Sequence, residues 1–240
     1  MSVLIAELQD KLLGKSIAEQ LQKLSEYFSG QVVFSTSFGL EDQVITHLIK
    51  TNDLPVKIFT LDTGRLFEET YSTWNKTIEK YDISISTYYP DVIQIQEFIT
   101  ARGPDSFYNS IENRKQCCGI RKVEPLQRAL NGNLVWITGI RAEQSNNRLE
   151  MPILEWDDVH QIIKFHPLLN WTWGQVKQFV SKNDIPHNPL HDKGFVSIGC
   201  APCTRAIKPG EDFRAGRWWW EDNSKKECGL HQSEVVAERK

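Results

Sequence analysis

Apolar side chains recur with a helical spacing near the start of the chain. Between residues 5 and 27 they stand at positions 8, 12, 13, 17, 21 and 24, which lie along one stripe of a helix. Gly14 interrupts that stripe, and glycine is unfavourable inside a helix. The pattern therefore predicts amphipathic helix over residues 5–27, with Gly14 as the point where it can divide in two.

Further along, short apolar runs of strand type alternate with stretches of helical periodicity. The expected strands are residues 31–34, 56–61, 83–88, 134–138 and 162–165, and the expected helices are 41–49, 67–81 and a stretch ending near 182. Asp91 and Thr172 each precede a glutamine by three positions, which is the spacing of a capping box that opens a helix. Strands that alternate with helices predict an α/β fold with a doubly wound, mostly parallel sheet.

Polar loops follow three of these strands. They are residues 35–39 (Ser-Thr-Ser-Phe-Gly), 62–65 (Asp-Thr-Gly-Arg) and 139–141 (Gly-Ile-Arg). The carboxyl ends of parallel strands meet at one edge of the sheet, and ligands of doubly wound folds bind there. Hydroxyls, backbone N–H groups and arginines near a helix N-terminus suit a phosphate group. We therefore expect a nucleotide site at this edge.

Four of the five cysteines fall into two pairs far apart in the chain. Cys117 and Cys118 are adjacent, whereas Cys200 and Cys203 have the Cys-x-x-Cys spacing that is common among metal ligands. Four thiolates are the usual ligand set for zinc or for a 4Fe–4S cluster. Adjacent side chains diverge in helix and in strand, so two neighbouring ligands require an unusual backbone, which a large cluster tolerates better than one ion. The pattern favours iron–sulfur over zinc; a redox Cys-x-x-Cys beside two buried thiols is the alternative.

Composition narrows the class of protein. The chain has 240 residues, of which 40% are hydrophobic and 25% charged, so it can bury a large core. The net charge of −3 argues against general nucleic-acid binding. No apolar run approaches a membrane span and the first residues are unlike a signal peptide, so we expect no membrane association and a cytoplasmic location. There, cysteines are more often metal-binding or catalytic than disulfide-bonded.

Several short motifs, in one order, carry a family resemblance. They are Ser37-Phe38-Gly39, Leu61-Asp62-Thr63-Gly64, Cys117-Cys118-x-x-Arg121-Lys122, Gly139-x-Arg141-x-Glu143-Gln144-Ser145, Cys200-x-x-Cys203 and Glu227-Cys228-Gly229-Leu230-His231. With these motifs, from about residue 30 to 231, the chain resembles the assimilatory sulfonucleotide reductases, and among them the iron–sulfur adenylyl-sulfate (APS) reductases. The resemblance implies one 4Fe–4S cluster per subunit, held by the two cysteine pairs.

The resemblance also implies a fold and a substrate. The fold is that of the adenine-nucleotide α-hydrolases, relatives of the ATP pyrophosphatases, whose phosphate loop (PP-loop) reads Ser-Gly-Gly-x-Asp-Ser. Residues 37–42 read Ser-Phe-Gly-Leu-Glu-Asp instead, which argues against ATP cleavage and fits a shorter phosphosulfate. Relatives that use the 3′-phosphorylated substrate PAPS commonly lack the cluster cysteines. We therefore expect APS as substrate, with PAPS or dual specificity as the alternative.

In this family the nucleophile corresponds to Cys228. Its thiolate is expected to attack the sulfur of APS, release AMP and form an S-sulfonate, from which thioredoxin or a glutaredoxin-like thiol releases sulfite. An unperturbed thiol is only slightly ionised near neutral pH, and His231 and nearby arginines are expected to favour the thiolate. We expect residues 1–220 to form a single domain that includes the cluster site, and residues 221–240 to form a flexible tail that carries Cys228.

The remaining candidate residues are cations and loop residues. Lys122, Arg214 and Arg217 are expected to offset the negative charge of the sulfate and phosphate, because a thiolate must approach both. Arg141 and Arg148 match an arginine-bearing loop of the family and are candidates for phosphate binding, with a structural ion pair as the alternative. Substrate contacts in the other two loops are assigned to Ser35, Ser37, Phe38, Gly39, Leu61, Asp62, Thr63, Gly64 and Arg65.

Two other functional classes fit parts of the sequence. An ATP-dependent thiolation enzyme of the same fold would need the pyrophosphatase loop that residues 37–42 lack. A non-catalytic nucleotide-binding module held together by a four-cysteine metal site would leave the motif around Cys228 without a role. We expect a homo-oligomer, for which the helix over residues 5–27 can supply an interface.

Overall fold

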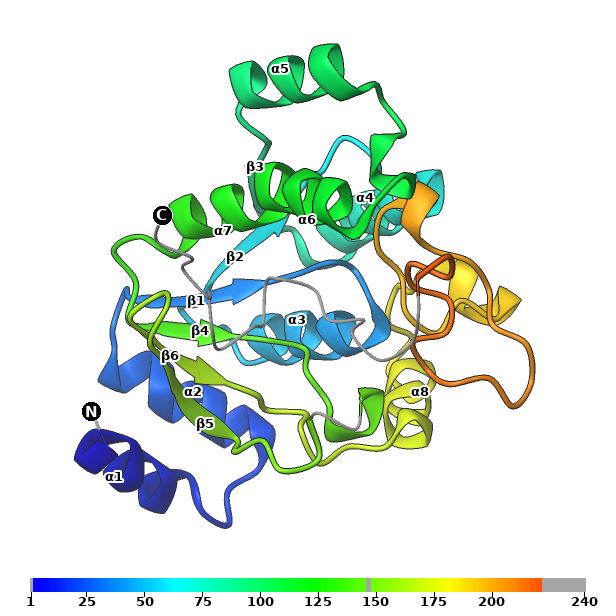
Figure 1. The fold of residues 1–240 in the computed structure, drawn as a ribbon. Coiled ribbons are helices and arrows are strands. Elements are labelled where there is room, and N and C mark those ends of the chain that lie inside the picture. Colours follow the sequence, from blue (N-terminus) through cyan, green and yellow to red (C-terminus); the bar gives the residue numbers. More distant parts are fainter. Residues whose placement is uncertain (1, 146–147, 222–240) are drawn as a thin grey trace.

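The computed structural model describes residues 2–145 and 148–221, and a six-stranded sheet lies at its centre (Figure 1). The strands are β1 (Val32–Ser35), β2 (Lys57–Leu61), β3 (Ser86–Tyr88), β4 (Val135–Ile137), β5 (Leu154–Asp157) and β6 (Ile162–Phe165). They lie in the order β3-β2-β1-β4-β6-β5, and every neighbouring pair is parallel except β5 with β6. The predicted doubly wound, mostly parallel α/β sheet is confirmed.

Helices cover both faces of this sheet. They are α1 (Ser2–Leu12), α2 (Ile17–Tyr27), α3 (Leu40–Thr51), α4 (Glu68–Tyr81), α5 (Val92–Arg102), α6 (Ile111–Cys118), α7 (Glu124–Leu130) and α8 (Trp173–Lys182). The alternation of side chains along β1 sorts them into two cores, since Val32 and Phe34 pack with α2, α3 and α8, whereas Val33 packs with α7. Both faces of the central strands are therefore buried.

Helix boundaries follow the local signals in the sequence. The helical stretch at the start of the chain divides around Gly14, which adopts a φ of 72° between α1 and α2. Asp91 and Thr172 are the N-caps of α5 and α8, and each side chain accepts a hydrogen bond from the backbone N–H three residues on. In Figure 1, α5 projects from the body of the molecule at the β3 edge of the sheet.

The adjacent cysteines lie where a helix changes its winding. Helix α6 ends at Cys118 and continues directly into a π-helical turn, Gly119–Val123, before α7. A π turn carries an extra residue and is often found at functional sites. The two cysteines themselves have regular α-helical backbone, so the unusual conformation expected at the pair is not found there; the irregular turn that follows carries Arg121 and Lys122.

Candidate functional site

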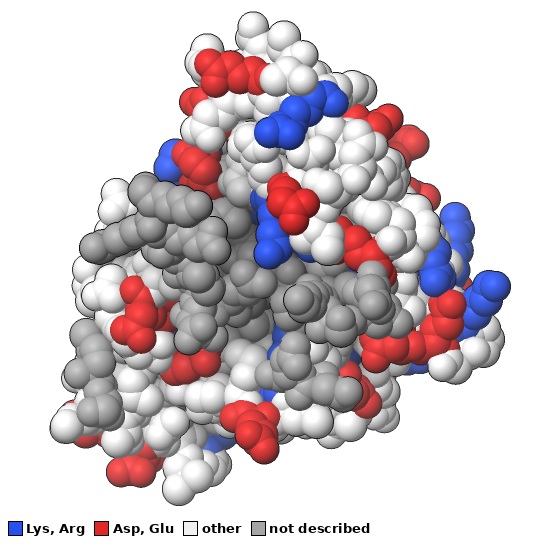
Figure 2. Space-filling model, viewed as in Figure 1, with Lys and Arg blue, Asp and Glu red and all other residues white. Residues whose placement is uncertain are grey.

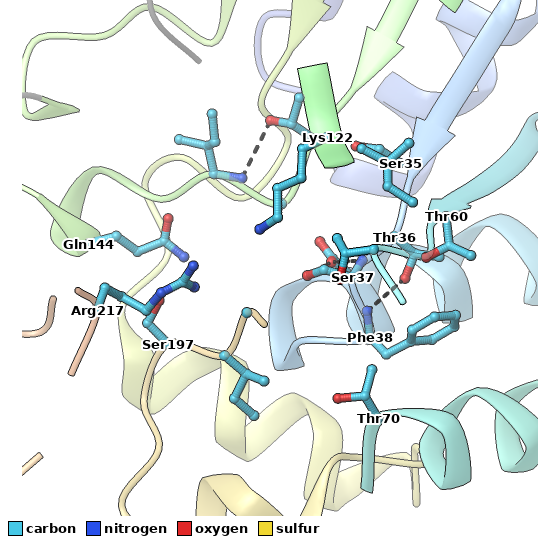
Figure 3. A pocket seen from close by; sticks show the side chains of 18 of the residues that line it. Ser35, Thr36, Ser37, Phe38, Thr60, Thr70, Lys122, Gln144, Ser197 and Arg217 are labelled. Carbon is cyan, nitrogen blue, oxygen red and sulfur yellow. Dashed lines mark hydrogen bonds between the residues drawn. The ribbon is translucent and has the colours of Figure 1, made fainter. Parts of the chain in front are cut away.

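A pocket of about 240 Å³ opens at the carboxyl ends of β1, β2 and β4 (Figure 3). It is lined by the loops after these strands and by the segment around residues 197–217. Of the expected substrate residues the lining includes Ser35, Ser37, Phe38, Leu61, Thr63, Arg148, Lys122, Arg214 and Arg217. We call it the main pocket. The expected convergence of the three loops brings these residues together.

The loop between β1 and α3 is held by its own side chains. The backbone N–H and the hydroxyl of Ser37 both donate to Oδ2 of Asp42, at 2.6 and 2.7 Å. Phe38 has a left-handed φ of 61°, which is rare for a bulky residue, and its buried ring stacks on Trp74. Burial raises the pKa of Asp42 to about 6, against the opposing effect of its hydrogen bonds with Ser37. The loop is thus a rigid unit with a buried carboxylate.

The loop after β2 separates the main pocket from a second cavity. Asp62 caps the loop by accepting from the N–H of Gly64 and the hydroxyl of Tyr71. Thr63 lines the main pocket, and its backbone carbonyl accepts from Arg121. Arg65 points to the other side, where its guanidinium donates to the carbonyl of Pro104 and lies over the ring of Phe107.

Arg141 is committed to a buried ion-pair network. Its Nε donates to Glu41 and its Nη1 to Glu143, at 2.7 and 2.6 Å, and its side chain is 0% exposed. The rings of Trp173 and Phe213 flank the guanidinium. Arg141 does not line the main pocket, so its geometry favours the structural ion pair that the sequence left as an alternative to phosphate binding.

Cationic side chains form the opposite wall of the main pocket. Figure 3 shows Lys122 and Arg217 pointing into it from the side facing Ser37 and Phe38. Arg217 is 7% exposed, and its Nε has no hydrogen-bond partner among the described residues. The guanidinium lies so close to Gly199 that a β-carbon there would overlap it. A buried guanidinium with an unused donor is suited to an anionic ligand.

The second cavity, here called the cysteine cavity, is lined by all four of the paired cysteines: Cys117, Cys118, Cys200 and Cys203. Its other lining residues are Arg65, Phe107, Arg114, Arg121, Lys122 and Pro202. Cysteines 82 positions apart in the chain are therefore brought together, as the sequence predicts, beside four cations. Lys122 lines both this cavity and the main pocket.

The thiols differ in their electrostatic surroundings. Burial raises the pKa of Cys203 to about 12, and the neighbouring Cys200 and Cys118 act in the same direction. Burial opposes ionisation of Cys200 as well, but Lys122, the Thr63 hydroxyl and Arg217 outweigh it and lower its pKa. The cations on the cavity wall therefore favour a negatively charged occupant.

Tryptophan side chains pack next to the cysteine cavity. Trp218 is 1% exposed and packs with three of the cysteines, and the guanidinium of Arg114 lies 4.6 Å from the centre of its ring. Arg114 also forms a two-pronged ion pair with Glu221. Trp218 thus packs against the cysteines and against a cation that lines their cavity.

The donor chemistry of this cavity fits an iron–sulfur group. In residues 2–145 and 148–221, no three His, Cys, Asp or Glu side chains stand in a geometry for a metal ion. Four cysteines that line one cavity are nevertheless the ligand set of a 4Fe–4S cluster. The surrounding cations would balance the negative charge of such a cluster. Cys228 and His231 lie outside the described residues.

Sequence reasoning missed three residues that shape the site. Asp42 stands in the sequence as part of a departure from a phosphate-loop motif, and its place in that loop is the signal that could have identified it. Gly199 precedes a cysteine of the second pair, and only the approach of Arg217 gives it a role. Arg114 is one of several cations near the first pair, and nothing in the sequence marks its partner.

Comparison with known proteins identifies the family. The family model of the phosphoadenosine phosphosulfate reductase domain matches residues 31–206. The adenosine 5'-phosphosulfate reductase of Sinorhizobium fredii (strain NBRC 101917 / NGR234) is 48% identical over 230 residues, which cover 96% of this chain and 91% of the relative. That of Allochromatium vinosum is 49% identical over 205 residues, covering 85% and 80%. Such relatives define a class of oxidoreductases that act on sulfonucleotides. The chain belongs to the phosphoadenosine phosphosulfate reductase family, and the expected sulfonucleotide reductase is confirmed.

Solved structures agree on the fold. A phosphoadenylyl-sulfate (PAPS) reductase from Candida auris, in a phosphate complex, superposes with a TM-score of 0.71 at 30% identity, covering 85% of this chain and 96% of that one. An FMN adenylyltransferase from Candida glabrata superposes with a TM-score of 0.54 at 17% identity, covering 97% and 85%, which is a likeness of fold alone. The expected adenine-nucleotide α-hydrolase fold is confirmed.

Two surface features bear on the expected partners. No helix within residues 2–145 and 148–221 is both long and apolar enough to cross a bilayer. On the face drawn in Figure 2, the acidic and basic side chains of the described residues are interspersed.

Proposed function

We propose that this protein reduces adenosine 5'-phosphosulfate to sulfite and AMP in sulfate assimilation. The observation that carries the proposal is the cationic wall of Lys122, Arg214 and Arg217, which lines the main pocket next to the cysteine cavity. A phosphosulfate needs cations around two neighbouring negative groups, and a pocket with hydroxyls on the opposite wall suits a nucleoside. The names and the high coverage of the curated relatives support the same substrate.

The cysteine cavity is proposed to hold one 4Fe–4S cluster through its four cysteines. When bound, the cluster would supply a fixed charge that orients Lys122 and Arg217 by electrostatics. Lys122 lines both cavities, so its ammonium group would interact with the charge of the cluster on one side and with the bound nucleotide on the other. The mechanism below moves two electrons between sulfur atoms, and no step requires the cluster to change its oxidation state.

Cys228 is the proposed nucleophile. Its thiolate attacks the sulfur of APS, a new S–S bond forms, and the electron pair of the S–O bond leaves with AMP. A second thiol, from a thioredoxin or a glutaredoxin-like protein, then attacks the Cys228 sulfur and releases sulfite. The sulfate sulfur gains two electrons, and the two thiols lose two as they become a disulfide. His231, three residues after Cys228, is proposed to favour the thiolate.

The cationic wall lowers the barrier to this attack. APS presents negative charge to an incoming thiolate, and the repulsion between them opposes the reaction. Arg217 and Lys122 offset that charge, and more strongly as the AMP leaving group develops its own. Arg148, which lines the same pocket and donates to Gln144, is proposed to bind the phosphate.

The rest of the expected organisation follows from this mechanism. Residues 1–220 are proposed to be one domain, and residues 221–240 a mobile arm, anchored at its first residue by the ion pair of Glu221 with Arg114, that brings Cys228 to the pocket and then to the reducing partner. Such exchange requires the nucleophile to reach two places in turn. A cytoplasmic location, a homo-oligomeric state and the absence of nucleic-acid and membrane partners are proposed on the sequence alone.

Mass spectrometry of the intact protein tests the proposal. Anaerobically prepared enzyme is incubated with APS or PAPS without a thiol reductant, beside a Cys228→Ser variant. A gain of one SO₃ with APS, absent from the variant and removed by thioredoxin, is expected. Equal gain with PAPS would widen the substrate class. Absence of any adduct from enzyme that retains iron and sulfide would overturn the mechanism.

A further inference from the structure

The loop between β1 and α3 contains its own anion. Asp42, in the first turn of α3, accepts the Ser37 N–H and the Ser37 hydroxyl on its Oδ2 at 2.6 and 2.7 Å. The backbone N–H of Gly39 also favours its ionised form. The donors that this loop would offer to a bound phosphate are therefore directed to a carboxylate of the chain itself.

The carboxylate is fixed in place from its other side. The space next to its Oδ1 is occupied by Gly139, where a β-carbon would overlap the oxygen. Asp42 is 8% exposed, yet it belongs to the lining of the main pocket. Its neighbour Glu41, 7% exposed, is held by Arg141 and adds a second negative side chain to the same helix end. The Asp42 carboxylate is therefore held between Ser37 on one side and Gly139 on the other.

Charge decides what such a loop can bind. A helix N-terminus with loop N–H groups ordinarily attracts phosphate. Here the Ser37 N–H and hydroxyl already donate to Asp42, so they are not available to a phosphate from solution. The phosphate would also lie close to the buried Asp42 carboxylate, where the repulsion between the two negative charges is weakly screened. The cations of the pocket lie on the opposite wall, as Lys122 and Arg217 do in Figure 3.

We propose that Asp42 is a specificity-determining residue that closes the β1–α3 loop to polyphosphate groups. A nucleotide then binds in one polarity only, with its anionic group against the wall of Lys122 and Arg217. Nucleoside triphosphates and inorganic pyrophosphate, which need anion sites beyond that wall, are rejected. This inference rests on the proposed function only for the choice of AMP as the control ligand.

A purely structural role for Asp42 makes a different prediction. If the carboxylate serves only to hold Ser37 in place, its removal loosens the loop and weakens every ligand of the pocket alike. If it excludes phosphate, its removal strengthens the binding of pyrophosphate while AMP is little affected. Asn at this position keeps an oxygen acceptor for Ser37 and removes the charge, so it separates the two roles.

The test is calorimetric titration of the holoenzyme with inorganic pyrophosphate and, separately, with AMP, at constant ionic strength. Wild type is compared with Asp42→Asn and with Glu26→Gln, which removes the same charge from an exposed position on α2. For Asp42→Asn we expect pyrophosphate to bind about tenfold tighter or more, and AMP to stay within about threefold of wild type. Glu26→Gln should leave both affinities unchanged.

Two results would overturn the proposal. Unchanged pyrophosphate affinity in a folded Asp42→Asn variant would show that the charge does not close the loop, and parallel weakening of both ligands would show a structural role. If Asp42→Asn does not fold, Asp42→Ser decides, because it also removes the charge and should also raise the affinity for pyrophosphate. A wild type that forms no S-sulfonate would refute the proposed function and leave this comparison standing.

Discussion

The guanidinium of Arg114 and the carboxylate of Glu221 meet in a two-pronged ion pair, Nε to Oε1 at 2.7 Å and Nη2 to Oε2 at 2.9 Å. The two side chains are 3% and 7% exposed, so both charges are nearly removed from water. Arg114 lines the cysteine cavity, and Glu221 is the last residue described before the part of the chain that carries Cys228. The pair therefore ties the helix of the first cysteine pair to the start of that part.

Breaking this pair from one side should destabilise the fold. Arg114→Met leaves the Glu221 carboxylate buried without a cation, and we expect a loss of about 3 kcal/mol in the free energy of unfolding. Denaturant titration of the single variants and of Arg114→Met/Glu221→Gln measures the coupling. The double variant should lose less than the sum of the two singles.

An exposed ion pair supplies the control. Arg128 and Glu124 lie one turn apart on α7 with 45% and 30% of their side chains exposed. Arg128→Met should cost less than about 1 kcal/mol. Equal costs at Arg114 and Arg128 would contradict the account of the buried pair.

Gly199→Ala should impair catalysis more than stability. Its β-carbon would overlap the guanidinium of Arg217, which sits at the flexible end of a long side chain and can move aside. We expect turnover to fall about tenfold or more, because Arg217 is lost from the cationic wall, while the melting temperature changes little. Steady-state kinetics on protein of known iron content checks this.

Gly174→Ala is the matched control. A β-carbon at Gly174 would meet only the Thr172 hydroxyl, at an ordinary contact distance of 3.8 Å. That variant should keep wild-type turnover. The explanation would be refuted by a Gly199→Ala enzyme that is as active as Gly174→Ala.

The stability of the fold should depend on the ionisation of Asp42. Burial raises its pKa from 3.8 to about 6, so the folded state holds the proton more tightly than the unfolded state does. Its favourable contribution is complete below about pH 4 and is lost as pH rises through about 6, with a total change of about 3 kcal/mol. Unfolding free energies of wild type minus those of Asp42→Asn, measured across this range, isolate the effect from other carboxyl groups. A difference that is flat with pH would disprove it.

Each cysteine of the cavity should be needed for the cluster, and Cys228 should not. Cys203→Ser removes one of four proposed ligands, so we expect anaerobically prepared protein to contain little iron and acid-labile sulfide. Cys228→Ser should keep the iron and sulfide content of wild type. Zinc without sulfide in the wild type would instead support the four-cysteine metal module.

The framework of the fold was predictable because its signals are local. The strand at residues 162–165 and the helix capped by Thr172 were expected with the bounds that the structure has. The antiparallel strand β5 was missed, since Leu154–Asp157 has no continuous apolar run and its pairing with β6 fixes it as a strand. Neither α6 nor the π turn after Cys118 has a periodic apolar face, so hydrophobic periodicity did not predict either helical segment.

The chemistry of the site was less predictable where partners are distant in the chain. Arg141 was a candidate for phosphate binding, yet its guanidinium is occupied by Glu41, 100 positions away, which no local pattern reveals. Arg65 was grouped with the substrate loop because it follows Asp62 in sequence. The turn at Gly64, with a φ of 67°, sends it to the cysteine cavity instead.

Residues shared by the main pocket and the cysteine cavity limit which substitutions such a protein can accept. Thr63 and Lys122 face the main pocket while also serving the cysteine cavity, through the Cys200 thiol and the cavity lining. A chain that lost one of the four cysteines would keep the cations that line the cavity but would lose part of the negative charge proposed to balance them. Replacing the cysteines would therefore also require changes to the charged and aromatic side chains that surround them.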